Sequence, residues 1–317
     1  MHSQTDVSTT LAGREPWHLD LIAFLAETQN PDGGWGYLRG RQSATEASAL
    51  AALALQSTRS EQARLERVLG YLRGQQRDSG GWPVNASDPS AAAWVSAWAG
   101  FALFRLEGWD RGCQKAAGFI LENFGPVRLP WTARLGRWLR GEKPPEGESL
   151  GGWMWNPGTA TWVEPTACAL LFLKAVEKSL GADSLSPVID EAERMLYNRM
   201  CPSGGWNYGN ARVLGEALRP FPLTTAIALL ALQDRDQRSE NQQSVEYLNQ
   251  ATRQDRSATS LSLAGLCLEV YGRPWRFLIP TLSAMYAETR YFENTKATAL
   301  ALLASRPEGE SNPFRLG

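Results

Sequence analysis

Two kinds of hydrophobic pattern alternate along the chain. Mixed segments whose apolar residues recur at i, i+3 and i+4 predict amphipathic helices at 19–28, 61–74, 113–123, 187–200 and 239–252. Segments that are apolar nearly all round predict buried helices at 47–55, 91–103, 166–176, 224–232, 259–270 and 298–303. No run alternates with the period of a strand. The pattern therefore predicts an all-α fold of six helical hairpins, with an inner and an outer ring of helices.

A repeated turn supports this architecture. Four Gly-Gly-Trp tripeptides precede buried segments and end at Trp35, Trp82, Trp153 and Trp206. A unit that recurs every 47 to 71 residues is typical of stacked helical hairpins. We expect a flexible N-terminus at 1–14, one domain at 15–305 and a C-terminal tail at 306–317.

Composition narrows the classes of function. The chain has 32 basic and 33 acidic side chains and no basic stripe with interleaved aromatics, which argues against a nucleic-acid partner. The four cysteines show no Cys-x-x-Cys spacing, so buried reduced thiols are expected. No apolar stretch approaches the roughly 20 residues of a membrane span, and no signal peptide is visible. These features predict a cytoplasmic protein without a transmembrane segment.

The repeats resemble those of squalene and other terpenoid cyclases and of protein prenyltransferase β subunits, across roughly residues 17–305. The resemblance implies an α/α toroid. In that family a glutamine near the end of an outer helix stacks on the tryptophan of the next turn. Gln29 with Trp35 and Gln75 with Trp82 keep this arrangement. The resemblance implies that these tryptophans hold the fold together and take no part in catalysis.

The same family implies a candidate acid. Class II terpenoid cyclases carry an Asp-x-Asp-Asp-Thr-Ala segment whose middle aspartate protonates an alkene or epoxide. Here the matching segment runs from Trp162 to Ala167 and places Glu164 at the middle position, with Trp162 and Pro165 replacing the flanking acids. A carboxyl without supporting carboxyls is a weaker acid. Glu164 is the catalytic candidate, and Pro165 at the first helical position would make Glu164 the cap residue.

Alignment of the starts of the buried helices gives further candidates. It places six residues at one equivalent position: Glu46, Trp94, Glu164, Leu223, Asp255 and Lys296. Glu46 and Asp255 are candidate binding residues near the mouth of a central cavity. An alternative interpretation is that both only cap helices, since Ser43-x-x-Glu46 matches a capping box and Asp255 precedes Ser257 by two residues.

Aromatic residues gather around these positions. Aromatic faces stabilise a carbocation without offering a nucleophile, although each ring could equally be core. The candidate substrate-binding aromatics are Trp94, Trp98, Trp155, Trp162, Tyr208 and Tyr291.

Other chemistry lacks its residues. The zinc site of a prenyltransferase needs Asp, Cys and His, yet the only histidines are His2 and His18. The same shortage argues against a Ser-His-Asp or Cys-His hydrolase. No metal and no cofactor are expected.

The sequence thus favours a cyclase-like toroid that binds an isoprenoid chain in an aromatic-lined cavity, with cyclisation initiated by an acid. Two alternatives stay open: a non-catalytic toroid that binds a lipid or protein, and a glycan-active α/α barrel using two carboxylates. Related cyclases carry a second domain that closes the site, so a partner chain is a further expectation. A hydrophobic ligand would also imply peripheral membrane contact, for which no basic amphipathic helix stands out.

Overall fold

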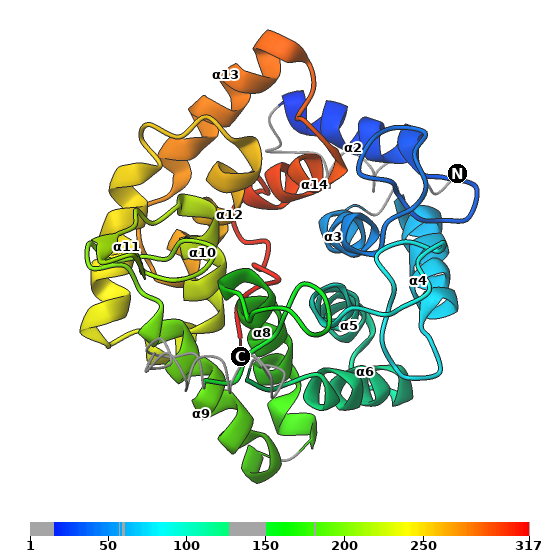
Figure 1. The fold of residues 1–317 in the computed structure, drawn as a ribbon. Helices are drawn as coiled ribbons and strands as arrows, with labels where there is room; N and C mark the ends of the chain where they lie inside the picture. Colours follow the sequence, from blue (N-terminus) through cyan, green and yellow to red (C-terminus); the bar gives the residue numbers. More distant parts are fainter. Residues whose placement is uncertain (1–15, 57, 59–60, 127–149, 181, 317) are drawn as a thin grey trace, which may run out of the picture.

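The computed structural model describes residues 16–316 except 57, 59–60, 127–149 and 181. The expected flexible N-terminus at 1–14 therefore lies outside the described residues. Within them, twelve α-helices form two concentric rings (Figure 1). The prediction of an α/α toroid is confirmed.

The inner ring consists of the helices that the sequence marks as apolar on all sides. Each packs against the helices before and after it, and the last packs against the first, which closes the ring. Alanine and leucine dominate these helices, because both favour helix formation. The small alanine side chain also allows neighbouring helices to approach closely. The inner helices are α3 (Thr45–Leu55), α5 (Ala93–Glu107), α8 (Val163–Leu180), α10 (Pro222–Ala231), α12 (Ala258–Val270) and α14 (Thr295–Ala304).

The outer ring covers the inner one. Each outer helix packs on the inner helix that precedes it in sequence, except α2, which packs on the last inner helix and so joins the two ends of the chain. The sequence pattern missed α13, whose polar and apolar residues contrast weakly. The outer helices are α2 (Pro16–Thr28), α4 (Gln62–Gln75), α6 (Arg111–Glu122), α9 (Ala182–Asn198), α11 (Ser239–Ala251) and α13 (Ile279–Thr289).

The Gly-Gly-Trp turns connect the rings by a repeated set of hydrogen bonds. All four tryptophans are fully buried. Each indole N–H donates to a backbone carbonyl near the end of the preceding outer helix: Leu25, Leu72, Ile120 and Leu196. Each tryptophan backbone N–H donates to a hydroxyl in the following inner helix: Ser48, Ser96, Thr166 and Thr225. These tryptophans are therefore structural.

Two glutamines extend this pattern. The side-chain amide of Gln29 donates to the carbonyls of Gly33 and Arg64, at 2.8 and 3.0 Å. Gln76 makes the equivalent bonds in the second unit, to Gly80 and Gly112. The sequence assigned this place to Gln75, which ends α4. Gln76 has the same spacing to its tryptophan as Gln29 has.

Backbone hydrogen bonds also tie the start of an inner helix to the turn of the next unit. The N–H of Thr45 donates to the carbonyl of Val84, and that of Val163 donates to Tyr208. The N–H of Thr295 donates to Tyr37, in the first unit of the chain. The ring is thus closed by the same kind of contact that links its consecutive units.

The C-terminal tail lies within the ring and fills it from the end where the inner helices stop. In Figure 1 the tail crosses the middle of the ring. Phe314 is fully buried and stacks on Phe101 of α5, with ring centroids 5.8 Å apart. The side chain of Gln233 donates to the carbonyl of Phe314 and accepts from the N–H of Leu316. The tail is therefore part of the packed structure.

Two short antiparallel strands, β1 (Arg212–Val213) and β2 (Glu216–Ala217), form an exposed hairpin, which the sequence pattern did not predict.

All four cysteines are buried and unpaired, as expected. Among the described helices, none is long and apolar enough to cross a membrane.

Candidate functional site

Three charged side chains meet inside one end of the inner ring. We call this end the mouth and define it by the second residue of each inner helix: Glu46, Trp94, Glu164, Leu223, Thr259 and Lys296. Because the inner helices run parallel, this shared register brings the six side chains to one level. Lys296 and Glu46 lie on neighbouring helices, whereas α8, which carries Glu164, is on the far side of the ring from α14.

Lys296 links the two carboxylates across the mouth. Its Nζ atom donates to Oε1 of Glu46 at 2.7 Å and lies 3.7 Å from Oε1 of Glu164. The hydroxyl of Tyr37 donates to the second oxygen of Glu46 at 2.5 Å. Both oxygens of Glu46 are therefore engaged, while Glu164 is held only by a longer ion pair.

The three side chains differ in access to solvent. The Glu46 side chain is 3% exposed, that of Glu164 13% and that of Lys296 18%. A ligand entering the mouth would therefore meet Glu164 and Lys296 before Glu46.

Burial and charge set the protonation of the cluster. Burial raises the pKa of Glu164; the nearby Lys296 ammonium opposes this effect and Glu46 reinforces it. Burial lowers the pKa of Lys296, but the Glu46 and Glu164 carboxylates outweigh burial and hold that pKa above its usual range. Burial, reinforced by Glu46, also raises the pKa of Tyr37. Lys296 therefore stays charged and Tyr37 stays a donor, while Glu164 is the group poised to exchange a proton.

The first turn of α8 differs from the sequence expectation. The helix begins at Val163, so Glu164 lies inside the first turn and is not the cap residue. Pro165 follows at the third position, where its missing N–H leaves no hydrogen bond unmade. The Glu164 side chain reaches into the ring, where Lys296 of α14 lies 3.7 Å away.

Capping does not account for Glu46 either. The cap residue of α3 is Ala44, and no side chain caps this helix. The hydroxyl of Ser43 instead donates to Asp32. The predicted capping box is therefore absent, and Glu46 is committed to Lys296 and Tyr37.

Aromatic side chains flank the mouth on the side of α5. Trp94 and Trp155 meet edge to face, with ring centroids 4.9 Å apart. Beside them is a pocket of about 370 Å³ between the start of α5 and the turn before α8. Its lining includes Phe124, Met154 and Trp155.

Trp162 and Tyr208 lie on the opposite flank of α8 from this pair. The ring of Trp162 lies so close to Gly209 that a Cβ atom added there would be 3.3 Å from it. The carbonyl of Tyr208 accepts from Val163, next to Glu164, while its ring packs against Phe221 at 5.3 Å and remains partly exposed.

Trp98 and Cys168 lie one helical turn deeper than Trp94 and Glu164. Trp98 is buried and contacts Phe314 of the tail edge to face at 6.0 Å. Burial raises the pKa of the Cys168 thiol well above its usual value, and Glu164 adds to the effect. The thiol is therefore protonated and is not an activated nucleophile.

The structure places two predicted site residues away from the cluster. Asp255 precedes α12 and accepts hydrogen bonds from the N–H of Ser257 and the hydroxyl of Ser260. It therefore stabilises the start of this helix, in line with the capping interpretation. The cap of α12 is Ser257, and the residue in register with Glu46 is Thr259, not Asp255. Tyr291 packs against Phe24 of the outer helix α2 at 5.7 Å.

Sequence reasoning left Tyr37 and Lys296 out of the predicted site. Lys296 was visible as a residue aligned with Glu46 and Glu164, and its positive charge between two aligned acids was the available signal. The sequence around Tyr37 gave no such signal. Its hydrogen bond to Glu46 depends on the tertiary contact between the first turn and α14, where the N–H of Thr295 donates to the Tyr37 carbonyl.

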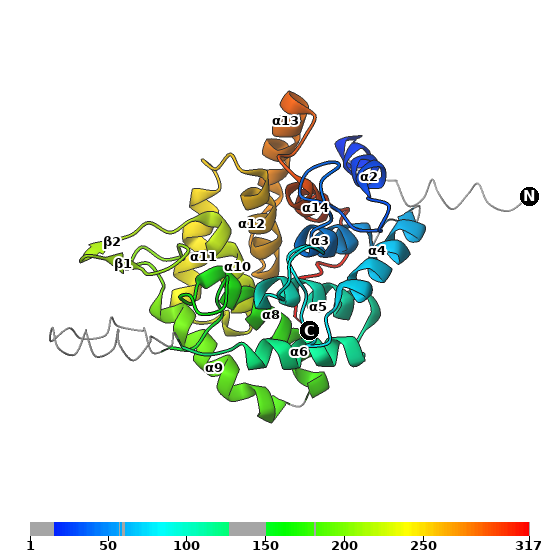
Figure 2. The same cartoon turned by 45° about the vertical axis from the view of Figure 1, so that its right-hand side comes forward.

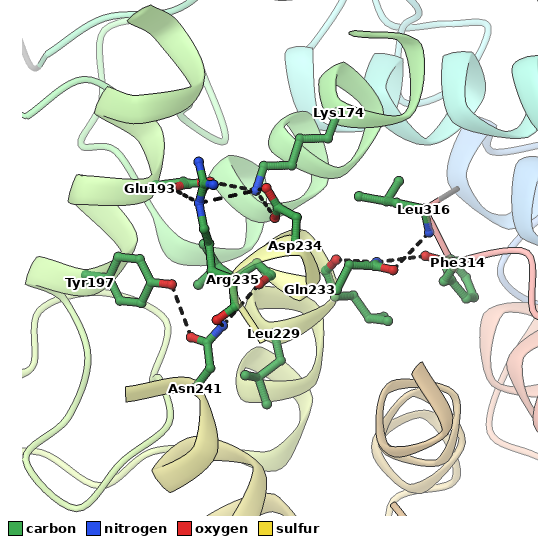
Figure 3. A network of polar contacts seen from close by, with 12 residues as sticks. Lys174, Glu193, Tyr197, Leu229, Gln233, Asp234, Arg235, Asn241, Phe314 and Leu316 are labelled. Atoms are coloured by element: carbon green, nitrogen blue, oxygen red, sulfur yellow. Dashed lines mark hydrogen bonds and ion pairs between the residues drawn. The ribbon is translucent and has the colours of Figure 1, made fainter. Parts of the chain in front are cut away.

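A second charged cluster lies about 15 Å farther along α8, estimated from the helical rise. Lys174 of α8 pairs with Glu193 of α9 at 2.7 Å and with Asp234 (Figure 3). Arg235 also pairs with Glu193, at 3.0 Å. This network joins α8, α9 and the 3-10 turn Gln233–Arg235, next to the residues that hold the tail. Its role is to fix these elements together.

Comparison with known proteins identifies the fold but no family. Neither protein-family models nor curated proteins match the chain. An α-amylase from Clostridium perfringens superposes with a TM-score of 0.61 and 10% identity, over 91% of this chain and 97% of that one. An α-1,6-mannanase of Salegentibacter superposes with a TM-score of 0.56 and 11% identity, over 91% and 98%. Type II terpene cyclase MstE from Scytonema superposes with a TM-score of 0.41 and 16% identity, over 94% of this chain and 97% of that one. The two superpositions with a TM-score above 0.5, at 10 and 11% identity, show the toroid fold alone.

Proposed function

We propose that the mouth binds a largely apolar molecule of the isoprenoid class and that Glu164 acts on it as a general acid. The observation that carries this proposal is the state of Glu164. Its carboxyl is mostly buried, its pKa is raised, and Lys296 holds it only at 3.7 Å. A protonated carboxyl in such a setting can donate its proton to a bound alkene.

Lys296 supplies support that the missing flanking acids would otherwise provide. Its charge stabilises the carboxylate that remains after proton transfer, which makes Glu164 a stronger acid than burial alone would leave it. Glu46 and Tyr37 fix the position of Lys296 through the 2.7 Å ion pair and the 2.5 Å hydrogen bond. A preorganised charge of this kind favours the transition state without reorganising during the reaction.

The aromatic residues fit the same chemistry. Trp94 holds the position in α5 that Glu164 holds in α8, Trp155 packs against Trp94, and Trp162 precedes Glu164 by two residues; none of these rings offers a nucleophile. Such rings can stabilise a positive carbon centre without quenching it. They would also provide the apolar surface that an isoprenoid chain needs.

The test is to incubate the purified protein with farnesyl, geranylgeranyl and squalene-type substrates and to analyse products and retained ligand by mass spectrometry. We expect cyclised product from the native protein and about 10²- to 10⁴-fold less from Glu164→Gln. Glu288→Gln, which removes an exposed carboxylate on α13, is the matched control and should match the native rate. Equal product from Glu164→Gln would remove Glu164 from the mechanism. Ligand retained unchanged by both proteins would identify a binding module.

A glycan-active enzyme is the second candidate. The Oε1 atoms of Glu46 and Glu164 lie 2.7 and 3.7 Å from the same lysine nitrogen and so at most about 6.4 Å apart, which is compatible with the roughly 5 to 5.5 Å between the carboxyl groups of retaining glycosidases. Lys296 occupies the space between them, where a glycosidic oxygen would have to bind. Release of reducing sugar from α-glucan or α-mannan, lost in both Glu46→Gln and Glu164→Gln, would support this candidate over the first.

A further inference from the structure

Exposed apolar side chains are concentrated on one short segment. Among the described residues, eight large hydrophobic side chains are exposed, and five of them lie between 208 and 221. We call these five the apolar strip: Tyr208, Val213, Leu214, Leu218 and Phe221. Single exposed apolar residues are ordinary, whereas a cluster of this kind marks an interaction surface.

The tip of the strip is an unusual leucine. Leu214 is 99% exposed and stands at the turn of the β1–β2 hairpin, which projects from the side of the ring (Figure 2). Its φ angle is 51°, in the left-handed region that disfavours a branched side chain. Gly215 follows and adopts the same region without a steric penalty. Neither burial nor backbone preference explains a leucine here, so its side chain is available for something outside the molecule.

The charged residues beside the apolar strip indicate what kind of surface it contacts. Arg212 and Arg219 flank the hairpin, and Glu216 is the one acidic residue between them. The three side chains are exposed and make no described ion pair with one another. An apolar tip between two arginines can insert among acyl chains while the guanidinium groups bind lipid phosphates.

The strip also connects with the mouth. The ring of Tyr208 packs on Phe221, and the Tyr208 carbonyl binds the N–H of Val163, next to Glu164. The part of the apolar strip formed by Tyr208 and Phe221 therefore lies beside the candidate site. Because Arg212 and Arg219 flank the exposed Leu214, the projecting hairpin suits a surface that is apolar inside and anionic outside, as a lipid bilayer is.

We propose that the β1–β2 hairpin docks the protein on the surface of an anionic lipid bilayer, with Leu214 inserted and Arg212 and Arg219 at the level of the phosphates. This docking does not depend on the activity proposed for Glu164. Where both hold, the hairpin would place the mouth next to a membrane that stores apolar ligands.

Vesicle sedimentation tests the proposal. The native chain should sediment with phosphatidylcholine vesicles that contain phosphatidylserine, and less with phosphatidylcholine alone. Leu214→Asp should weaken binding about tenfold or more, the effect of losing one inserted leucine. Replacing both arginines by glutamine should weaken it to a similar extent. Leu19→Asp, at an exposed leucine of α2, is the matched control and should bind like the native chain.

A second variant separates docking from folding. Leu214→Asn should keep or slightly raise the melting temperature, because asparagine tolerates a positive φ, and should still lose vesicle binding. Failure of the native chain to bind either kind of vesicle would overturn the proposal. So would native-like binding by Leu214→Asp, or a concentration-dependent dimer that Leu214→Asp dissolves, since the strip would then cover a second copy of the chain.

Discussion

Glu164 illustrates how a neighbouring charge decides what a residue can do. Taken alone, one glutamate in an apolar ring would be protonated and inert. Lys296 approaches to 3.7 Å, close enough to stabilise the anion but too far to hold it by a hydrogen bond. Glu46, at 2.7 Å, keeps the lysine in place. The residue that could transfer a proton is therefore the least tightly bound member of the cluster.

The pH dependence of stability should report the state of Glu164. Its pKa is higher in the folded protein than in the unfolded chain, so the folded state holds the proton more tightly. The window of the effect runs from about pH 4.3, the pKa of glutamate in an unfolded chain, up to the folded pKa. As pH rises through it, the free energy of unfolding of the native protein should fall relative to that of Glu164→Gln. The total fall should be about 1.4 kcal/mol for each unit between the folded and unfolded pKa values of Glu164. Above the folded pKa the difference should stay constant.

Urea unfolding at a series of pH values measures this difference, with Glu288→Gln as the control for loss of one acidic group. A difference that grows in favour of the native protein with rising pH would mean that Lys296 outweighs burial and that the pKa of Glu164 is lowered.

Part of the site was predictable residue by residue. Glu46 and Glu164 could be found because a short motif marks where each inner helix begins. Asp255 was aligned with them, but Thr259 holds the equivalent position, because α12 begins only after Ser257, its cap. Tyr291 packs on Phe24 of the first outer helix, a contact between the two ends of the chain that the local sequence does not reveal.

At the scale of elements, a hydroxyl in each of four inner helices binds the backbone of a tryptophan turn. Ser48, Ser96, Thr166 and Thr225 perform this role at distances of 2.7 to 3.1 Å. These bonds explain why an otherwise apolar helix repeatedly carries serine or threonine near its start. The register of inner helix against turn follows from them.

Loss of one such hydroxyl should be costly. Ser96→Ala would leave the buried N–H of Trp82 without its 2.7 Å partner, and we expect a loss of about 1–3 kcal/mol in the free energy of unfolding. Ser262→Ala is the matched control, since the Ser262 hydroxyl is buried in α12 with no partner among the described residues. Its removal should be neutral or slightly stabilising. Urea unfolding of both variants measures the contrast, and equal losses would mean that the turn bond contributes nothing.

For the whole molecule, the tail closes the end of the ring opposite the mouth. Phe314 packs between Phe101 and Trp98, and Gln233 holds the backbone on either side of Arg315. The tail contacts elements that are more than 80 residues away in sequence. Its packing therefore stabilises the closed ring rather than one hairpin.

Phe314→Ala should lower the free energy of unfolding by about 3–5 kcal/mol, because a fully buried ring is replaced by a cavity that rigid helices cannot fill. Phe24→Ala, at a half-buried ring on outer helix α2, should cost less. Far-ultraviolet circular dichroism in urea measures both. A loss for Phe314→Ala no larger than for Phe24→Ala would show that the tail is not part of the cooperative core.

The sequence by itself determined the alternation of helices, the repeated turns and the class of fold, because hydrophobic periodicity and turn residues act over short distances. It also placed two acids near one level of the ring. The tertiary structure alone decided that Lys296 bridges them, that Tyr37 supports Glu46, and that the tail enters the ring. Lys296 and Glu46 are 250 residues apart, so their contact exists only because the last hairpin closes on the first. Local sequence patterns do not reveal a contact between residues so far apart, and the candidate chemistry depends on that contact.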